Sequence, residues 1–310
     1  MGKISVSTPA TTLGLEVLDT GAVALSRVGS NDLSQVDNQN KEQMTLTEVQ
    51  VTGENIHHKG VGFVSTEPGS SLHYLSHQVT DNDQGKLLTV IQKNKTGNLK
   101  VINHYQLYNN TPVIRSWVTL ENVGTASLGV EYVSSFALTG VNQAQDLTGN
   151  YATDNTLYVA NNDWTAEAQW KANTLKDTGL DYWVDGEERQ ASSKRISITN
   201  NSSWSCSEYS PNGLLVNNKT GQVAIWQIEN NGAWHYELTD IGAGNLLAIR
   251  LSGPEEYDNH WWKDLQPGEQ FTTVTVAFGQ LMGDFETAVG AMTKYRRNIR
   301  RPNTDDQRLA

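Results

Sequence analysis

The sequence predicts a mainly β protein, an antiparallel sandwich of unusual size. Apolar residues alternate with polar ones in most segments, and the runs are rich in Val, Ile, Tyr, Phe and Thr. Asn, Gly and Pro close these runs, and helical spacing is rare. Many short strands with one face on a core produce this pattern. At 310 residues the chain is long enough for one large domain or two ordinary ones.

The predicted strands follow one another through most of the chain. Turn sequences such as NNKTG, NNG and LQPGEQ separate them. In the last run, Phe271, Val274, Val276 and Phe278 nearly alternate with threonines, as in one half-buried strand. The runs cover residues 86–94, 99–110, 111–124, 128–140, 194–204, 213–234, 245–253 and 269–280.

Two segments depart from this period. The spacing in residues 166–179 fits a short helix ending at Gly179. Residues 284–301 give the clearest helix, with Asp284 as its N-cap and Pro302 as its stop. We therefore expect a sandwich over residues 1–283 and a connector helix with a linker over 284–310. The apolar face of this helix repeats at spacings of three and four: Phe285, Ala288, Val289, Met292, Tyr295 and Ile299.

Charge and composition exclude several classes of function. The net charge of −11 argues against nucleic acid or an anionic membrane as the main partner. Residues 294–308 are locally basic, with six Lys or Arg against two Asp, but apolar residues interrupt them. Cys206 is the single cysteine, so no internal disulfide or cysteine metal cluster is expected. No signal peptide or long apolar run is visible, and we expect a cytoplasmic protein without cofactor or metal.

The residue types that carry chemistry do not form a complete active site. Eight of the nine tryptophans lie between Trp164 and Trp262, which suits contact with sugar rings, although a single tryptophan more often fills a core. His73 and His77 share one face of a predicted strand about 13 Å apart, too far for a metal ion. Acidic residues are numerous, but none has a recognisable catalytic context.

Several segments together resemble the N-terminal region of family 36 glycoside hydrolases, the bacterial-type α-galactosidases. The most specific are WQIENNGAWHYE (226–237) and the terminal VGAMTKYRRNIRRPN (289–303), supported by TEVQVTGENIHHKG (47–60). The resemblance begins near residue 45 and covers most of the chain. It implies a large β-supersandwich related to galactose mutarotase, followed by a helix that leads into a (β/α)₈ catalytic barrel.

In that family two barrel aspartates cleave terminal α-linked galactose, as in melibiose or raffinose, with retention. The Lys-Trp-Asp nucleophile motif is absent here, and family sequences continue past the equivalent of Leu309. The expectation is a truncated, non-catalytic domain with no catalytic residue of its own. Its partners would be its own barrel, a galactoside and further copies in a homo-oligomer.

The resemblance also gives candidate substrate-binding residues. The family's Asp-aromatic-Arg pocket motif is missing from residues 30–80. The candidates are therefore Trp164 with Glu167, in NDWTAE, and His57 with His58, in a loop of a comparable region.

Two other functions stay open. A stand-alone mutarotase would use a histidine acid and a carboxylate base, and His104 with Glu131 fits if their strands pair. A lectin-like binding module would use exposed aromatic platforms without catalysis.

Overall fold

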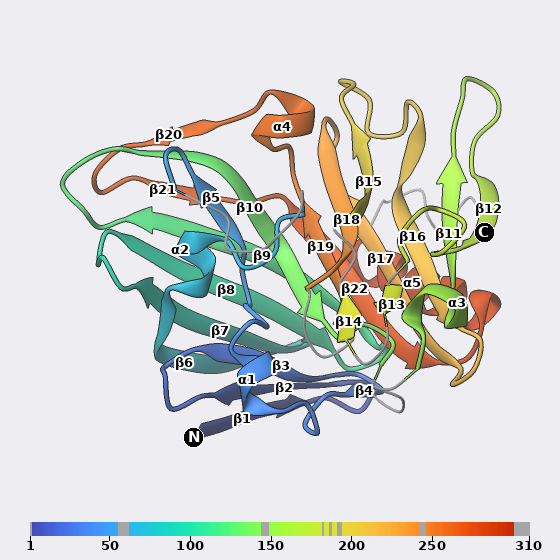
Figure 1. Ribbon diagram of the computed structural model, residues 1–310, viewed down its shortest axis with the longest axis horizontal. Helices are drawn as coiled ribbons and strands as arrows, with labels where there is room; N and C mark the ends of the chain where they lie inside the picture. Colours follow the sequence, from blue (N-terminus) through green and yellow to red (C-terminus); the bar gives the residue numbers. More distant parts are fainter. Residues whose placement is uncertain are drawn as a thin grey trace.

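The computed structural model describes residues 2–54, 62–143, 149–181, 194–241 and 246–300, with the backbone of 183–185 and 188–190. Its strands form four antiparallel sheets, and the two largest pack face to face (Figure 1). This confirms the mainly β, antiparallel sandwich with a C-terminal helix. No described helix has the length and apolar character needed to span a membrane.

The ten-stranded sheet runs in the order β12-β11-β16-β17-β22-β9-β8-β7-β6, with β21 also paired to β9. Its strands are β6 (Leu72–Asn82), β7 (Gly85–Asn94), β8 (Leu99–Tyr108), β9 (Val113–Asn122), β11 (Asn155–Asn161), β12 (Gln169–Thr174), β16 (Tyr209–Asn217), β17 (Gln222–Glu229), β21 (Gln270–Thr272) and β22 (Thr275–Met282).

The six-stranded sheet runs in the order β15-β18-β19-β10-β20, with β5 also paired to β10. Its strands are β5 (Val49–Val51), β10 (Leu128–Thr139), β15 (Arg195–Asn200), β18 (Trp234–Asp240), β19 (Leu247–Ser252) and β20 (Lys263–Leu265).

Two smaller sheets and five helices complete the described fold. One sheet holds β1 (Gly2–Ser7), β2 (Thr12–Val17), β3 (Val23–Val28) and β4 (Asn31–Asp32), and the other pairs β13 (Trp183–Asp185) with β14 (Glu188–Gln190). The helices are α1 (Asn38–Lys41), α2 (Glu67–Ser70), α3 (Tyr151–Asp154), α4 (Glu256–Asn259) and α5 (Phe285–Ile299).

The main core lies between the large sheets and the β1–β4 sheet. In β7 alternate residues face it, and Leu88 and Val90 are fully buried there. Phe136 of β10 and Phe278 of β22 stack across the sheets with ring centroids 4.6 Å apart. A buried ion pair lies within the six-stranded sheet, where Arg250 Nη2 of β19 is 3.0 Å from Oε1 of Glu48, the residue before β5.

Helix α5 packs on the outer face of the ten-stranded sheet, as its apolar stripe predicts. Ala288, Met292 and Tyr295 are buried there, among residues of β9, β16, β17 and β22. Asp284 caps its first turn by accepting a hydrogen bond from the Thr287 amide at 2.9 Å. The helix ends at Ile299, ahead of Pro302. The predicted role of residues 284–310 as a connector stays a prediction.

Two predicted elements differ from the structure. Residues 166–179 contain no helix, because Gln169–Thr174 pair with β11 as the exposed edge strand β12. The segment lacks an apolar stripe that would hold a helix on the core, so sheet pairing satisfies its backbone instead. Residues 269–280 are not one strand but two, since the chain leaves the sheet at Thr273 and Val274 between β21 and β22.

Candidate functional site

The loop between β11 and β12 carries Trp164 and Glu167, both exposed. Trp164 is 76% exposed, and its ring lies 5.8 Å from that of Trp204 at an angle of 34°. Side-chain oxygens hold the turn: the Trp164 amide donates to Asp163 Oδ1 at 2.7 Å, and the Ala168 amide donates to Asn162 Oδ1 at 2.6 Å. The loop therefore presents Trp164 to solvent on a defined turn. Its partner Trp204 was not singled out by the sequence.

His57 and His58, the other two predicted binding residues, lie outside the described residues. Their assignment to a substrate pocket stays a prediction, as does that of Trp164 and Glu167.

The mutarotase pairing of His104 with Glu131 is not formed. His104 lies on β8 of the ten-stranded sheet, whereas Glu131 lies on β10 of the six-stranded sheet. The His104 ring stacks on Trp117 with centroids 5.0 Å apart, and Glu131 Oε1 accepts a hydrogen bond from Thr52 Oγ1 at 2.7 Å. Burial lowers the pKa of His104, which makes it a poor proton donor at neutral pH.

His73 and His77 also differ from the prediction, because they do not share a face of β6. A β-bulge between Tyr74 and Ser76 shifts the register against β7. As a result His77 faces the same side as Tyr74, whose hydroxyl lies 2.7 Å from His77 Nδ1.

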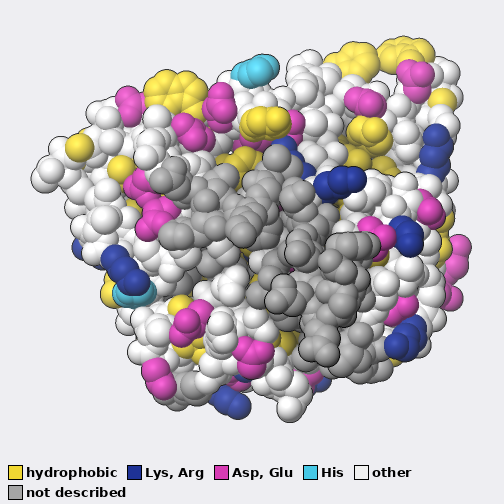
Figure 2. Space-filling view, in the orientation of Figure 1, with side chains coloured by type: hydrophobic (Ala, Val, Ile, Leu, Met, Phe, Trp, Pro, Cys, Tyr) yellow, Lys and Arg dark blue, Asp and Glu magenta, His cyan; other side chains and the backbone are white. Residues whose placement is uncertain are grey.

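Exposed aromatic side chains gather at one end of the sandwich. They come from the β11–β12 loop, the β15–β16 loop, α4 and the chain just before β20, which lie along one edge in Figure 1. Figure 2 shows hydrophobic side chains along this same upper edge. The residues are Trp164, Trp204, Tyr257 and Trp262, each at least 58% exposed. This contrasts with Trp226 and Trp234, which are fully buried. Three of the tryptophans, Trp164, Trp204 and Trp262, therefore lie outside the core.

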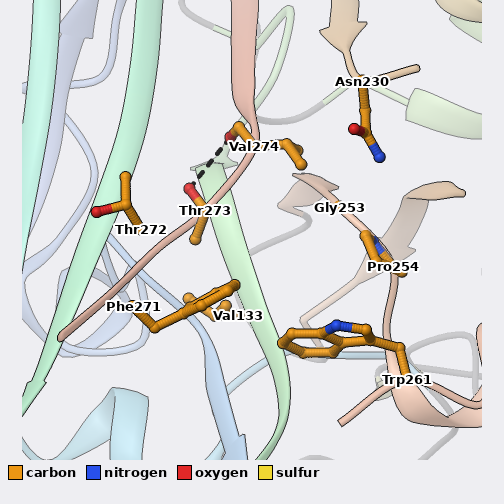
Figure 3. A pocket seen from close by; sticks show the side chains of 9 residues that line it. All are labelled: Val133, Asn230, Gly253, Pro254, Trp261, Phe271, Thr272, Thr273 and Val274. Atoms are coloured by element: carbon orange, nitrogen blue, oxygen red, sulfur yellow. Dashed lines mark hydrogen bonds between the residues drawn. The ribbon is translucent and has the colours of Figure 1, made fainter. Parts of the chain in front are cut away.

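A cavity of about 240 Å³ opens where the chain crosses from β21 to β22. Figure 3 shows Asn230, Pro254 and Trp261 on one side of it and Phe271 with Thr272 on the other. The Trp261 and Phe271 rings lie 5.4 Å apart, tilted by 40°. The lining residues are Val133, Asn230, Gly253, Pro254, Trp261, Phe271, Thr272, Thr273 and Val274. Sequence reasoning missed this cavity, because its wall depends on the break between the two strands.

A buried polar cluster connects β15, β18 and α4. Arg195 lies 2.9 Å from Glu237 Oε2 and 3.2 Å from Asp258 Oδ2, measured from its two terminal nitrogens. His235 lies between the same two carboxylates, 3.4 Å from each. Its ring is completely buried, as is Glu237. His235 and Glu237 are two residues apart on β18, so both point to the same face.

The pKa values in this cluster shift through burial and pairing. Burial alone lowers the pKa of His235, but its hydrogen bonds to Asp258 and Glu237 outweigh burial and raise it. Burial raises the pKa of Glu237, while His235 and Arg195 together lower it below its ordinary value. The hydrogen bond from His235 lowers the pKa of Asp258. The cluster is thus most stable as paired charges.

His235, Asp258 and Glu255 have the spacing of a metal site, with ligand atoms within 4.8 Å of one another. Their existing contacts do not fit a divalent cation. Glu255 accepts hydrogen bonds from the amides of Tyr257 and Asp258, both at 2.6 Å, and so caps α4. The Arg195 guanidinium already supplies positive charge to Asp258. We interpret these side chains as the anchor of α4.

Part of the chain matches a known protein family in sequence, and the chain matches several solved structures in fold. Residues 19–158 match the family model described as the glycosyl hydrolase family 36 N-terminal domain. No curated protein matches the chain in sequence. Solved structures of α-galactosidases share the fold, at 12–14% identity, and the chain spans less than half of their length.

Three of these structures show the extent of the match. An α-galactosidase from Geobacillus stearothermophilus in complex with stachyose has a TM-score of 0.72 at 12% identity, covering 99% of this chain and 44% of its own. The α-galactosidase AgaB from the same organism has a TM-score of 0.70 at 14% identity, covering 98% of this chain and 43% of its own. The α-galactosidase from Lactobacillus brevis has a TM-score of 0.67 at 13% identity, covering 95% of this chain and 41% of its own. Residues 19–158 are therefore similar to the N-terminal domain of glycosyl hydrolase family 36, and the chain shares its fold with these α-galactosidases.

Proposed function

We propose that this chain is the non-catalytic N-terminal domain of an α-galactosidase. A separate (β/α)₈ barrel would hydrolyse terminal α-D-galactosyl residues of melibiose- or raffinose-type galactosides with retention. One observation carries the proposal: the fold accounts for 95–99% of this chain but only 41–44% of the α-galactosidases compared. In this proposal α5 is the connector to the barrel.

The chemistry of the described residues supports a non-catalytic role. Retaining hydrolysis needs two carboxyl groups about 5–5.5 Å apart on either side of an accessible sugar. The structure does bring Glu237, Asp258 and Glu255 together, but each is occupied by Arg195, by His235 or by the α4 backbone. Glu237 has no exposed side-chain surface for a sugar to reach, and Asp258, which is 22% exposed, is already paired with Arg195 and His235.

The first test compares this chain with the complete product of its reading frame. We expect the complete product to hydrolyse p-nitrophenyl α-D-galactoside and the 310-residue chain to be inactive, measured by nitrophenolate release. Turnover by the 310-residue chain above a buffer control would contradict the non-catalytic assignment. Inactivity of a folded complete product would contradict the α-galactosidase assignment.

Within this function, Trp164 and Glu167 would form one wall of the substrate pocket. The exposed Trp164 ring can stack on a sugar, and Glu167 can accept hydrogen bonds from sugar hydroxyls. In the complete enzyme, Trp164→Ala should raise KM for raffinose at least about fivefold with an unchanged melting temperature. Trp262→Ala is the matched control, since Trp262 is 58% exposed on a different segment. Equal KM values for both variants would contradict the assignment.

The second candidate is a lectin-like module, which the exposed Trp164–Trp204 pair favours. Calorimetric titration of the chain with raffinose tests it, and heat that saturates and disappears in Trp204→Ala would support it. A mutarotase is less favoured because its two expected residues lie in different sheets. Accelerated mutarotation of fresh α-D-galactose in polarimetry would reverse that judgement.

A further inference from the structure

The cavity beside β21 has aromatic walls and a shape suited to one ring-sized ligand. The cavity is open, so a ligand can enter it. Its volume of about 240 Å³ lies below the roughly 300–1,000 Å³ of sites that bind drug-sized ligands. Trp261 and Phe271 offer aromatic surface, and neither side chain is fully buried. A cavity of this size with partly exposed aromatic rings favours a compact ligand that has an apolar face.

Two polar groups at the cavity have unused hydrogen-bonding capacity. The Asn230 amide is fixed because its Nδ2 donates to the Ala233 carbonyl at 2.6 Å. Asn230 lines the cavity (Figure 3), and its Oδ1 accepts no hydrogen bond from the described part of the chain. The Trp261 indole N–H likewise has no acceptor among the described residues, and its nitrogen lies on the cavity side of the ring (Figure 3). The cavity thus offers one donor and one acceptor.

The remaining polar groups of the wall are already paired. Thr273 Oγ1 accepts from the Val118 amide at 3.0 Å and donates to the Val274 carbonyl at 3.1 Å. Thr272 Oγ1 lies 3.1 Å from Thr119 Oγ1. These bonds hold the crossing between β21 and β22 in place, so the wall is rigid without any ligand.

Charge limits the ligand further. Among the described residues that line the cavity, none carries a charged side chain. A charged ligand would lose hydration there without gaining an opposite charge, which is costly. A neutral molecule with hydroxyls on its rim and C–H groups on its faces has the matching chemistry.

We infer that this cavity is a binding site for a single neutral sugar ring, in addition to the substrate wall proposed at Trp164. The ring stacks against Trp261 and Phe271. One hydroxyl accepts from the Trp261 N–H, and another donates to Asn230 Oδ1. The site rests on the cavity and not on the α-galactosidase assignment, so either can fail alone.

Calorimetric titration of the 310-residue chain with D-galactose and D-glucose tests the site, with D-galacturonate as a charged comparison. At least one neutral sugar should bind saturably in the millimolar range, and the anion more weakly. Trp261→Ala should weaken binding at least about tenfold, because it removes both the ring and the donor. Trp262→Ala, the next residue, is the matched control and should bind as the native chain does, because its exposed side chain does not line the cavity.

Trp261→Phe separates binding from folding, since it keeps a ring and removes only the N–H. Its melting temperature should stay near that of the native chain, and its affinity should fall about three- to tenfold. Three results would each overturn the inference: no binding of either neutral sugar, binding lost in Trp262→Ala but kept in Trp261→Ala, or native affinity in Trp261→Phe.

Discussion

Helices α5 and α4 are both fixed to a sheet, but by different forces. Helix α5 has 15 residues and buries Ala288, Met292 and Tyr295 against the ten-stranded sheet. Helix α4 has four residues and buries none of them. It is held instead by its cap, by Asp258 in the His235 cluster, and by Asn259, whose Nδ2 donates to Thr199 Oγ1 at 3.0 Å.

The difference shows what each attachment depends on. Apolar burial is insensitive to pH and tolerates small changes of shape at moderate cost. A buried charge cluster offers little net stability, yet removing one member leaves the other charges unpaired in the protein interior, which solvates charge poorly. We therefore expect α5 to respond to lost volume and α4 to respond to lost charge.

The largest effect is expected at Arg195, which binds Glu237 and Asp258 with a side chain only 7% exposed. Arg195→Met leaves Glu237 buried beside one fewer cation, and should reduce the free energy of unfolding by about 3–5 kcal/mol. Urea denaturation measures it. Arg27→Met is the control, because its partner Asp32 is 46% exposed and the loss should stay under about 1 kcal/mol. Similar losses of unfolding free energy in both variants would show that burial of the ion pair does not determine the cost of breaking it.

The next effect concerns the apolar attachment of α5. Met292→Ala removes a side chain that is 2% exposed, and the cavity left behind should cost about 2–5 kcal/mol in unfolding free energy. The same change at Met282, which is 46% exposed on β22, should cost under about 0.5 kcal/mol. Because both variants lose the same methionine side chain, any difference between their denaturation curves reports the packing of Met292. Overlapping curves would mean that this packing does not stabilise the fold.

The third effect is a pH dependence of the α4 attachment. The raised pKa of His235 contributes stability that is complete below its ordinary value of 6.5 and is lost as pH rises through the raised pKa. The lowered pKa values of Glu237 and Asp258 contribute stability present above 4.5 and 3.8 respectively, which is lost as pH falls through the lowered values. The cluster should therefore contribute most between pH 4.5 and 6.5.

Unfolding free energies measured across pH would reveal this contribution. Above pH 6.5 the slope should be negative and at most about 1.4 kcal/mol per pH unit. The slope should vanish in His235→Gln, which keeps a polar side chain without the titration. An unchanged slope in that variant would place the dependence elsewhere.

The smallest effect is a single hydrogen bond beneath α5. The Tyr295 hydroxyl donates to Glu229, which also pairs with Arg115 at 2.7 Å. Tyr295→Phe should cost about 1 kcal/mol of unfolding free energy, since Arg115 still neutralises the carboxylate. Tyr257→Phe provides the control, because Tyr257 is 69% exposed. A loss well above that of Met292→Ala would show that α5 depends mainly on its polar contact.

Local sequence predicted the elements whose signals are local. The alternating runs at 86–94 and 128–140 became β7 and β10, and the three- and four-residue spacing after Asp284 became α5. Each signal needs only the geometry of one strand or one helix, so it can be read without knowing the neighbours.

Placement in three dimensions was not predictable in the same way. One bulge moved His77 to the other face of β6, and the break at Thr273 and Val274 opened a cavity inside an apparently continuous strand. The sheet assignment separated His104 from Glu131. Such outcomes depend on register and on which strands pair, and those are set by contacts between residues far apart in the chain.

The sequence alone determined that the chain folds as a β sandwich with one long amphipathic helix, since period and capping are properties of neighbouring residues. It also held WQIENNGAWHYE, the segment that supplies Glu229, Asn230 and His235. Only the tertiary structure decided their roles. Burial at the sheet interface paired His235 with carboxylates, and the gap beside β21 left Asn230 facing an open cavity. The sequence determines which chemical groups each side chain has, but packing determines which groups it contacts and whether water reaches it.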